Sequence, residues 1–242
     1  MVGLFAWTEP GRGRRSVGLE ETGVLRMRVV RVDVVRSPYL ALSRRRVVAA
    51  GKKLHKRGVV QAVLPEDFPF QEQLEHCGLR PVSTLALRRA IAADWVRWGL
   101  AESGRPAAGA RVAVSAASLT GEVVRTVTEL ALRHRYVLLD LPYGGEELCR
   151  QLRREYGVSL LLGPSKEQLE GAEALVLFDF RTDLTLGNPV ALRLFDESQA
   201  LPPLSLPPQL EEQLPQGADR GQLLAALREA GVLRREQIVL GK

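Results

Sequence analysis

The second half of the chain alternates short apolar runs with stretches of helical periodicity. Strands are predicted at 112–114, 136–140, 158–162, 174–178 and 190–195, with one helix after the first strand, a second at 146–156 and a short one after Pro164. Strand-helix alternation is typical of parallel sheets, in which every connection must return from the carboxyl end of one strand to the amino end of the next. This order therefore predicts a doubly wound α/β sheet.

The first residues of the chain predict further strands. Leu4–Trp7 and Val17–Leu19 are short apolar segments separated by the loop EPGRGRRS, and together they indicate a hairpin. From Val24 to Val35 the apolar residues alternate, but they change parity between Val29 and Val30. A β-bulge produces such a change, so we expect a long bulged strand here.

A helix is predicted at 38–57. Ser37 suits its N-cap, Pro38 its first position, and Gly58 the position after its C-terminus. The apolar segment 59–64 then predicts a buried strand.

The loop after this strand, Pro65–Pro69, contains Glu66 and Asp67. It falls at the carboxyl edge of the predicted sheet, where α/β proteins tend to bind ligands. These acids could act on a substrate, but capping the next helix is the role that we favour.

The helix with the strongest pattern is Thr84–Leu100. Its apolar stripe includes Trp95 and Trp98, and such a pair is more often part of a core than of a ligand site. We expect this helix to bridge two lobes. The expected parts are an N-terminal α/β lobe at 1–83, the bridging helix and linker at 84–105, a second lobe at 106–200, and a proline-rich strap with a final helix and strand at 201–242.

Composition excludes several classes of protein. The chain has 242 residues, of which 45% are hydrophobic, and it has no apolar run long enough to cross a bilayer and no secretory signal pattern. Two cysteines, Cys77 and Cys149, form no CxxC motif, and the three histidines have no metal-ligand spacing. We expect a cytoplasmic protein without a metal site.

Basic residues are concentrated at the N-terminal end. Residues 1–60 contain 14 lysines and arginines against four acids, whereas the rest of the chain is slightly acidic. Residues 12–57 could therefore bind nucleic acid or another acidic surface. We favour a solvated helix face, because aromatic residues that would stack on bases are not interleaved with the basic ones.

The loop after the strand at 112–114 has the layout of a dinucleotide-binding turn. In the motif G-x-G-x-x-G the glycines allow the tight turn, the approach of the pyrophosphate and helix-strand packing. Here the three positions are Ala116, Ser118 and Gly121, or Ser115, Ser118 and Gly121 with the wider spacing, so only the packing glycine is present. Asp140 follows 19 residues after Gly121, near the offset of about 20 at which an acid binds a ribose hydroxyl. A solvated aspartate that begins a turn explains Asp140 equally well.

The order of a small α/β lobe, a bridging helix and a second lobe resembles the two-lobed dehydrogenases typified by shikimate dehydrogenase and methylenetetrahydrofolate dehydrogenase. Residues 107–180 resemble the NAD(P)-binding Rossmann superfamily. The resemblance implies an α/β fold of two Rossmann-like lobes with parallel sheets joined by the bridging helix. It also implies a catalytic lysine and aspartate in or beside the first lobe, and the chain has no matching pair: Lys52 and Lys53 lie on the basic helix, and Asp94 has no evident lysine partner.

Three functions are consistent with these features. We favour a non-catalytic binding or regulatory protein that keeps the scaffold. The first alternative is an NAD(P)-dependent oxidoreductase, in which Ser115, Ser118 and Thr120 join the backbone at the pyrophosphate and Asp140 favours NAD over NADP. The second alternative is a binder of nucleic acid or acidic surfaces through residues 12–57.

Overall fold

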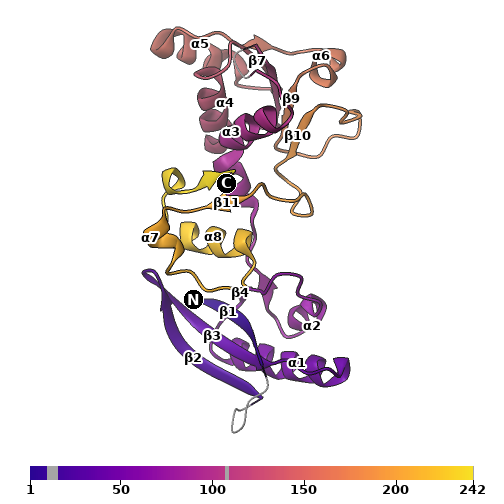
Figure 1. Cartoon of the computed structure of the whole chain (residues 1–242). Coiled ribbons are helices and arrows are strands. Elements are labelled where there is room, and N and C mark those ends of the chain that lie inside the picture. Colours follow the sequence, from indigo (N-terminus) through magenta and orange to yellow (C-terminus); the bar gives the residue numbers. More distant parts are fainter. Residues whose placement is uncertain (10–15, 107–108, 242) are drawn as a thin grey trace. The chain divides into compact units, whose positions relative to one another are not determined.

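The computed structural model describes residues 1–9, 16–106 and 109–241 (Figure 1). The chain forms two compact units. The first contains Met1–Thr84 and Leu204–Val239, and the second contains Leu85–Pro203 and the residues from Leu240 onward. Each unit is built on a five-stranded sheet.

The sheet of the first unit is mixed, with the strand order β2-β3-β1-β4-β5. Its strands are β1 (Val2–Thr8), β2 (Val17–Val24), β3 (Met27–Val35), β4 (Gln61–Val63) and β5 (Arg80–Pro81). β2 runs antiparallel to β3, and the other pairs are parallel. The expectation of a wholly parallel sheet is thus wrong for this unit. Only two residues, Leu25 and Arg26, connect β2 to β3, and so short a connection can join only antiparallel strands.

Two further expectations for these strands are corrected. Leu4–Trp7 and Val17–Leu19 do not form a hairpin, because β3 lies between β1 and β2. The predicted loop of that hairpin lies mostly outside the described residues. β3 also has no bulge, since its register against both neighbours advances one residue at a time.

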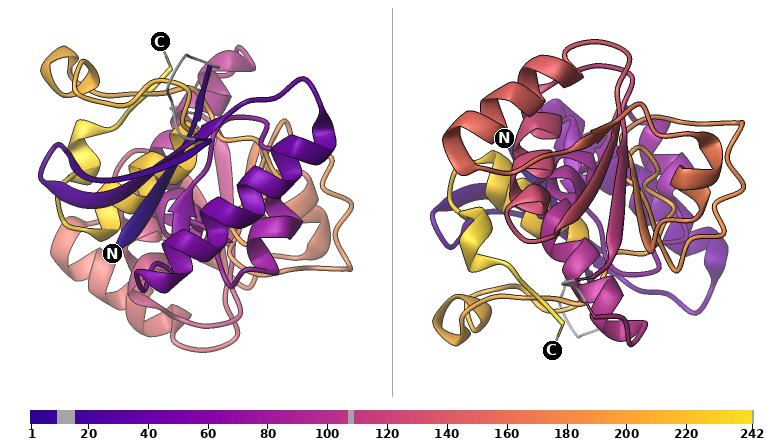
Figure 2. Two further views of the ribbon diagram at one scale, coloured as in Figure 1. Left: turned by 90° about the horizontal axis from the view of Figure 1, so that it is seen from below. Right: turned by 90° about the horizontal axis from the view of Figure 1, so that it is seen from above.

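The change of parity in β3 has another cause: both faces of this sheet are covered. α1 (Leu40–Lys56) packs on the face that carries Val30, and α8 (Arg220–Glu229) lies against β4 on the other side (Figures 1 and 2). Val29 and Val30 point to opposite faces and both are buried. A covered strand need not alternate between apolar and polar residues.

The basic helix α1 is confirmed, but its N-cap is Tyr39 rather than Ser37. The Ser37 hydroxyl accepts a hydrogen bond from the Tyr39 amide at 3.2 Å, which fixes the turn before the helix. Gly58 follows the helix with φ of +75°, as expected of a residue after the C-cap.

The remaining elements of the first unit come from both of its chain segments. They are α2 (Gln71–Glu75), β11 (Leu204–Ser205), α7 (Pro208–Glu211) and the 3-10 helix η1 (Arg235–Gln237), with β12 (Val239–Leu240) pairing with β11. Asp219 caps α8 by accepting a hydrogen bond from Gln222 N at 2.8 Å.

The sheet of the second unit is entirely parallel, as predicted, with the order β10-β9-β6-β7-β8. Its strands are β6 (Arg111–Ser115), β7 (Tyr136–Asp140), β8 (Leu161–Leu162), β9 (Ala174–Leu177) and β10 (Val190–Arg193). β7 and β8 lie on one side of β6, and the later strands β9 and β10 lie on its other side. The carboxyl ends of β6 and β9 therefore flank a topological switch point, where open α/β sheets bind ligands.

Helices cover both faces of this second sheet (Figure 2, right). They are α3 (Leu85–Glu102), α4 (Gly121–Ala131), α5 (Gly145–Tyr156) and α6 (Lys166–Glu170). α3 packs on α4, β9 and β10, whereas Leu169 of α6 joins the cluster formed by Ala113, Leu138 and Leu175. In the described part of the chain, no helix is long and apolar enough to cross a membrane.

Candidate functional site

The six residues expected to bind a cofactor lie at the carboxyl ends of β6 and β7 or in the loop that follows β6. Ser115 ends β6 and pairs in register with Asp140, which ends β7. Ser115 and Ala116 are buried, whereas Ser118 and Thr120 are exposed. The structure thus brings Ser115 and Asp140 together and leaves the other hydroxyls on the loop surface.

The backbone of this loop explains how it does without glycine. All residues from 115 to 121 are described, and none has a positive φ, so alanine and serine fit the turn without strain. Thr120 caps α4 by accepting a hydrogen bond from Val123 N at 3.3 Å. The packing role expected of Gly121 is wrong, because a Cβ added there would meet no atom within 4 Å.

A carboxylate from the segment after β9 binds a backbone amide of this loop. Asp179, two residues after β9, accepts a hydrogen bond from Ala117 N at 2.7 Å. Backbone amides of this loop and of the helix start are the groups that bind pyrophosphate in dinucleotide sites. The Ala117 amide is therefore already engaged by an anion of the protein itself.

Arg181 links the ends of β6 and β7 through its guanidinium. Its Nη1 donates to Ser115 Oγ at 2.8 Å and forms an ion pair with Asp140, while Ser115 Oγ donates to the same Asp140 oxygen at 2.9 Å. The other side of the guanidinium contacts both carboxylate oxygens of Asp183, each at 2.8 Å. Asp140, the expected partner of a ribose hydroxyl, is thus bound within the protein.

This bidentate contact predicts an unusual titration of Asp183. The hydrogen bond from Arg181 stabilises the carboxylate and lowers its pKa from 3.8 to about 2. Because the folded pKa is depressed, the contact contributes stability above pH 3.8 and loses it as the pH falls through about 2. A carbon-13 NMR titration of the Asp183 carboxyl should give a midpoint near pH 2, and Arg181→Gln should move it toward 3.8. A midpoint that does not respond to Arg181→Gln would contradict the contact.

The sequence reasoning overlooked Asp179, Arg181 and Asp183. All three follow β9, whose carboxyl end lies next to that of β6. The predicted strand at 174–178 was itself a usable signal, because the residues after each parallel strand gather at one edge of the sheet.

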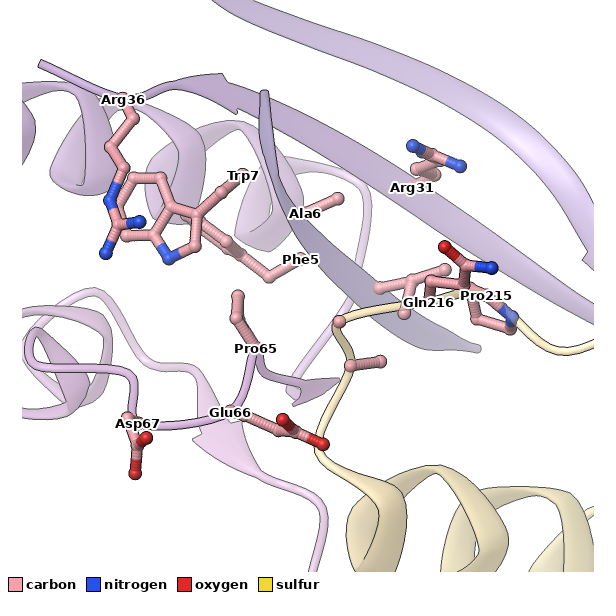
Figure 3. Close-up of a pocket in the computed structure, with 13 residues that line it drawn as sticks. Phe5, Ala6, Trp7, Arg31, Arg36, Pro65, Glu66, Asp67, Pro215 and Gln216 are labelled. Carbon is pink, nitrogen blue, oxygen red and sulfur yellow. The ribbon is translucent and has the colours of Figure 1, made fainter. Parts of the chain in front are cut away.

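The first unit has a pocket of about 590 Å³ at the corresponding edge of its own sheet (Figure 3). Its wall includes Trp7 near the end of β1, Arg36 directly after β3, and Glu66 and Asp67 after β4. Pro215, Gln216, Gly217 and Ala218 close it on the side of α8. The pocket therefore combines three strand ends with a segment from the C-terminal part of the unit.

Aromatic rings make one wall of this pocket rigid. Trp7 contacts Phe5, Phe68 and Phe70, with ring centroids 5.6 to 6.1 Å apart for its three pairs. The guanidinium of Arg36 lies 5.8 Å from the centroid of the Trp7 ring, within reach of a cation-π contact. Trp7 is held by these contacts and keeps part of its surface exposed to the pocket.

The two acids of the loop do not cap the next helix. The N-cap of α2 is Phe70, and no side chain bonds to that cap, so the favoured role of Glu66 and Asp67 is wrong. Both acids are exposed and line the pocket. Their loop is held by a bridge between Pro65 and Ala218 and by a hydrogen bond from Asp219 N to Leu64 O at 2.7 Å.

The basic residues of α1 are used partly inside their own unit. Arg46 donates to Val35 O at 2.8 Å, Lys53 donates to Val17 O at 3.1 Å, and Arg57 pairs with Glu21 at 2.7 Å. These contacts fix side chains that a nucleic acid would need. Arg12, Arg14 and Arg15, which begin the expected basic region, lie outside the described residues.

The remaining candidate residues lie apart from these two sites. Cys77 and Cys149 are free thiols, and Asp94 pairs with Arg133 at 2.8 Å and with Arg97 at 3.5 Å rather than with a lysine. Across the described ranges, no group of three His, Cys, Asp or Glu side chains could hold a metal ion. Comparison of the chain with protein-family models finds no matching family, and comparison with curated proteins finds no matching sequence.

Proposed function

We propose that this chain is a non-catalytic binding protein whose second unit is a Rossmann-like scaffold without a working dinucleotide site. The single observation that carries the proposal is the Asp179 carboxylate bonded to the Ala117 amide. The strand order β10-β9-β6-β7-β8 supports the Rossmann-like part, because doubly wound nucleotide-binding sheets place their strands in the same relation.

A dinucleotide would have to displace two internal contacts of the protein. Its pyrophosphate would meet the negative charge of Asp179 at the amide that should bind it, and its ribose would have to separate Asp140 from Arg181. A hydrogen bond to a charged group contributes about 1.5 to 3 kcal/mol, so each displacement weakens binding by a factor of roughly 10 to 100. Binding by this protein is instead assigned to the pocket of the first unit.

The test is calorimetric titration of the protein with NAD and with NADP. We expect no complex tighter than micromolar, which corresponds to a binding free energy of about 8 kcal/mol. Asp179→Asn, which removes the charge at the loop and keeps the side-chain size, should improve whatever weak binding is seen. Glu129→Gln, a change of the same kind on α4, serves as the control and should not.

A different result would favour the oxidoreductase hypothesis. If the unaltered protein binds NAD or NADP more tightly than micromolar, and Ser118→Trp abolishes that binding, the loop accepts the cofactor as it stands. The proposal of a non-catalytic scaffold then fails.

A further inference from the structure

We propose that the pocket of the first unit binds a small zwitterion, an α-amino acid with an apolar side chain. This inference rests on the proposed function, which assigns small-molecule binding to the first unit. It adds the chemical class of the ligand, and it follows from the charges, the aromatic wall and the rigidity of the pocket.

Arg36 and two acids lie on opposite sides of the pocket without pairing. Figure 3 shows Arg36 beside Trp7 on one side of the pocket and Glu66 and Asp67 on the other. Among the described residues, no ion pair within 4.0 Å joins Arg36 to either acid or gives either acid another basic partner. A ligand with one positive and one negative group can pair with both sides at once.

The presence of both signs of charge favours a zwitterion over a simple ion. The wall carries two arginines, Arg31 and Arg36, and two acids, Glu66 and Asp67. Arg31 is already paired with Asp33 at 3.0 Å, which leaves Arg36 to bind a carboxylate. Glu66 and Asp67 then remain for an ammonium group, whose three N–H donors suit carboxylate acceptors.

One wall of the pocket is apolar. Trp7 offers part of its ring to the pocket, and Phe5 lies beside it among the lining residues. Large aromatic surfaces bind apolar side chains and exclude water, and this strengthens nearby charged contacts. A volume of about 590 Å³ lies within the range of about 300 to 1,000 Å³ that is typical of small-molecule pockets.

The backbone around the pocket is held in place, and a preformed site binds at a lower ordering cost. Trp7 is packed among three phenylalanines, and Arg36 follows β3 with its own amide bonded to Thr8 O at 2.9 Å. The loop of Glu66 is held to the opposite segment by a hydrogen bond from its amide to Gly217 O at 3.3 Å. The backbone on both charged sides of the pocket is therefore held by hydrogen bonds.

The experiment uses L-phenylalanine and two analogues that each lack one charge. Phenethylamine has the ammonium without the carboxylate, and 3-phenylpropionate has the carboxylate without the ammonium. We expect calorimetry on the full chain to detect saturable binding of L-phenylalanine and binding of each analogue at least tenfold weaker. The remaining L-α-amino acids are titrated in the same way, and the apolar ones should bind more tightly than the acidic and basic ones.

Variants locate the site. Arg36→Gln and Glu66→Gln should each weaken L-phenylalanine binding at least tenfold. Arg45→Gln on α1 and Glu72→Gln on α2 change the same kinds of exposed side chain outside the pocket and should leave binding unchanged. Because all four side chains are largely exposed, the variants are expected to fold, and matching circular dichroism spectra check this.

Each outcome separates this inference from the proposed function. Equal binding of phenethylamine, or insensitivity to Arg36→Gln, overturns the zwitterion and leaves a small-molecule site in the first unit. If no L-α-amino acid binds, the inference fails. A complex with NAD or NADP tighter than micromolar instead overturns the proposed function, whatever the amino acids do.

Discussion

Replacing Trp95 with alanine is expected to lower the free energy of unfolding by about 3 to 5 kcal/mol, the usual cost of removing a large aromatic side chain from a core. Trp95 is only 4% exposed, in a helix that packs on α4, β9 and β10. Arg88 places its guanidinium 5.8 Å from the centroid of the Trp95 ring and donates to Glu197 O at 2.9 Å, so the alanine variant also disturbs this contact.

Urea denaturation followed by circular dichroism measures this change. Arg97→Ala is the matched control, because Arg97 is exposed on the same helix and loses only its pair with Asp94 at 3.5 Å. Exposed pairs of this kind contribute about 0 to 1 kcal/mol. If Trp95→Ala destabilises the protein no more than Arg97→Ala does, the assignment of Trp95 to the core is wrong.

Asn188→Ala is expected to cost about 2 kcal/mol, within the range of about 1 to 3 kcal/mol for leaving buried polar groups without partners. The Asn188 side-chain amide donates to the carbonyls of Leu169 and Ala172 at 2.9 Å and to that of Glu170 at 3.2 Å. Asn188 is 8% exposed, so water cannot readily replace these bonds. It ties the segment that carries Arg181 and Asp183 to the end of α6.

The comparison for Asn188 is Thr185→Ala in the same segment. The Thr185 hydroxyl donates to an exposed carboxylate, Glu170, at 2.9 Å, and water can take its place. We expect a loss below about 1 kcal/mol for this variant. Equal losses for the two variants in the same denaturation experiment would show that the three carbonyl contacts do not hold the segment.

The sequence predicts the second unit well because its strands are separated by helices of clear periodicity. The segments 136–140 and 174–178 match β7 and β9 closely, and helix 146–156 matches α5. Asp140 also lies at the end of β7, where the predicted strand 136–140 ends. Local periodicity suffices to predict these elements because the chain repeats strand-helix units.

The first unit is harder to predict because it combines two distant segments of the chain, Met1–Thr84 and Leu204–Val239. α8 comes from residues 220–229 and covers the face of the sheet that carries Val29. Without that helix the pattern at Val29 and Val30 looks like a bulge, and no local signal in residues 24–35 indicates the cover. The antiparallel pair of β2 and β3 was not predicted for a local reason, since Leu25 and Arg26 are not typical residues of a two-residue turn.

The candidate sites show the same limit at the level of side chains. Asp140 could be predicted at the edge of the second sheet, but its partner Arg181 is 41 residues away in sequence. The pocket of the first unit joins Trp7 and Glu66 to Gln216, and no spacing rule relates these positions. Motif spacing identifies residues within one strand-helix unit, whereas these contacts arise from the order of strands in the sheet.

The most direct test of the closed dinucleotide site is the amide resonance of Ala117 in a proton-nitrogen NMR spectrum. If Asp179 occupies that amide, titration with NAD or NADP should give no saturable shift of the resonance with a Kd of about 1 µM or below, because the carboxylate holds the amide and the dinucleotide must displace it. Asp179→Asn should shift the resonance without any ligand. A saturable shift of the Ala117 amide by either dinucleotide at micromolar concentration, in the unaltered protein, would contradict the account.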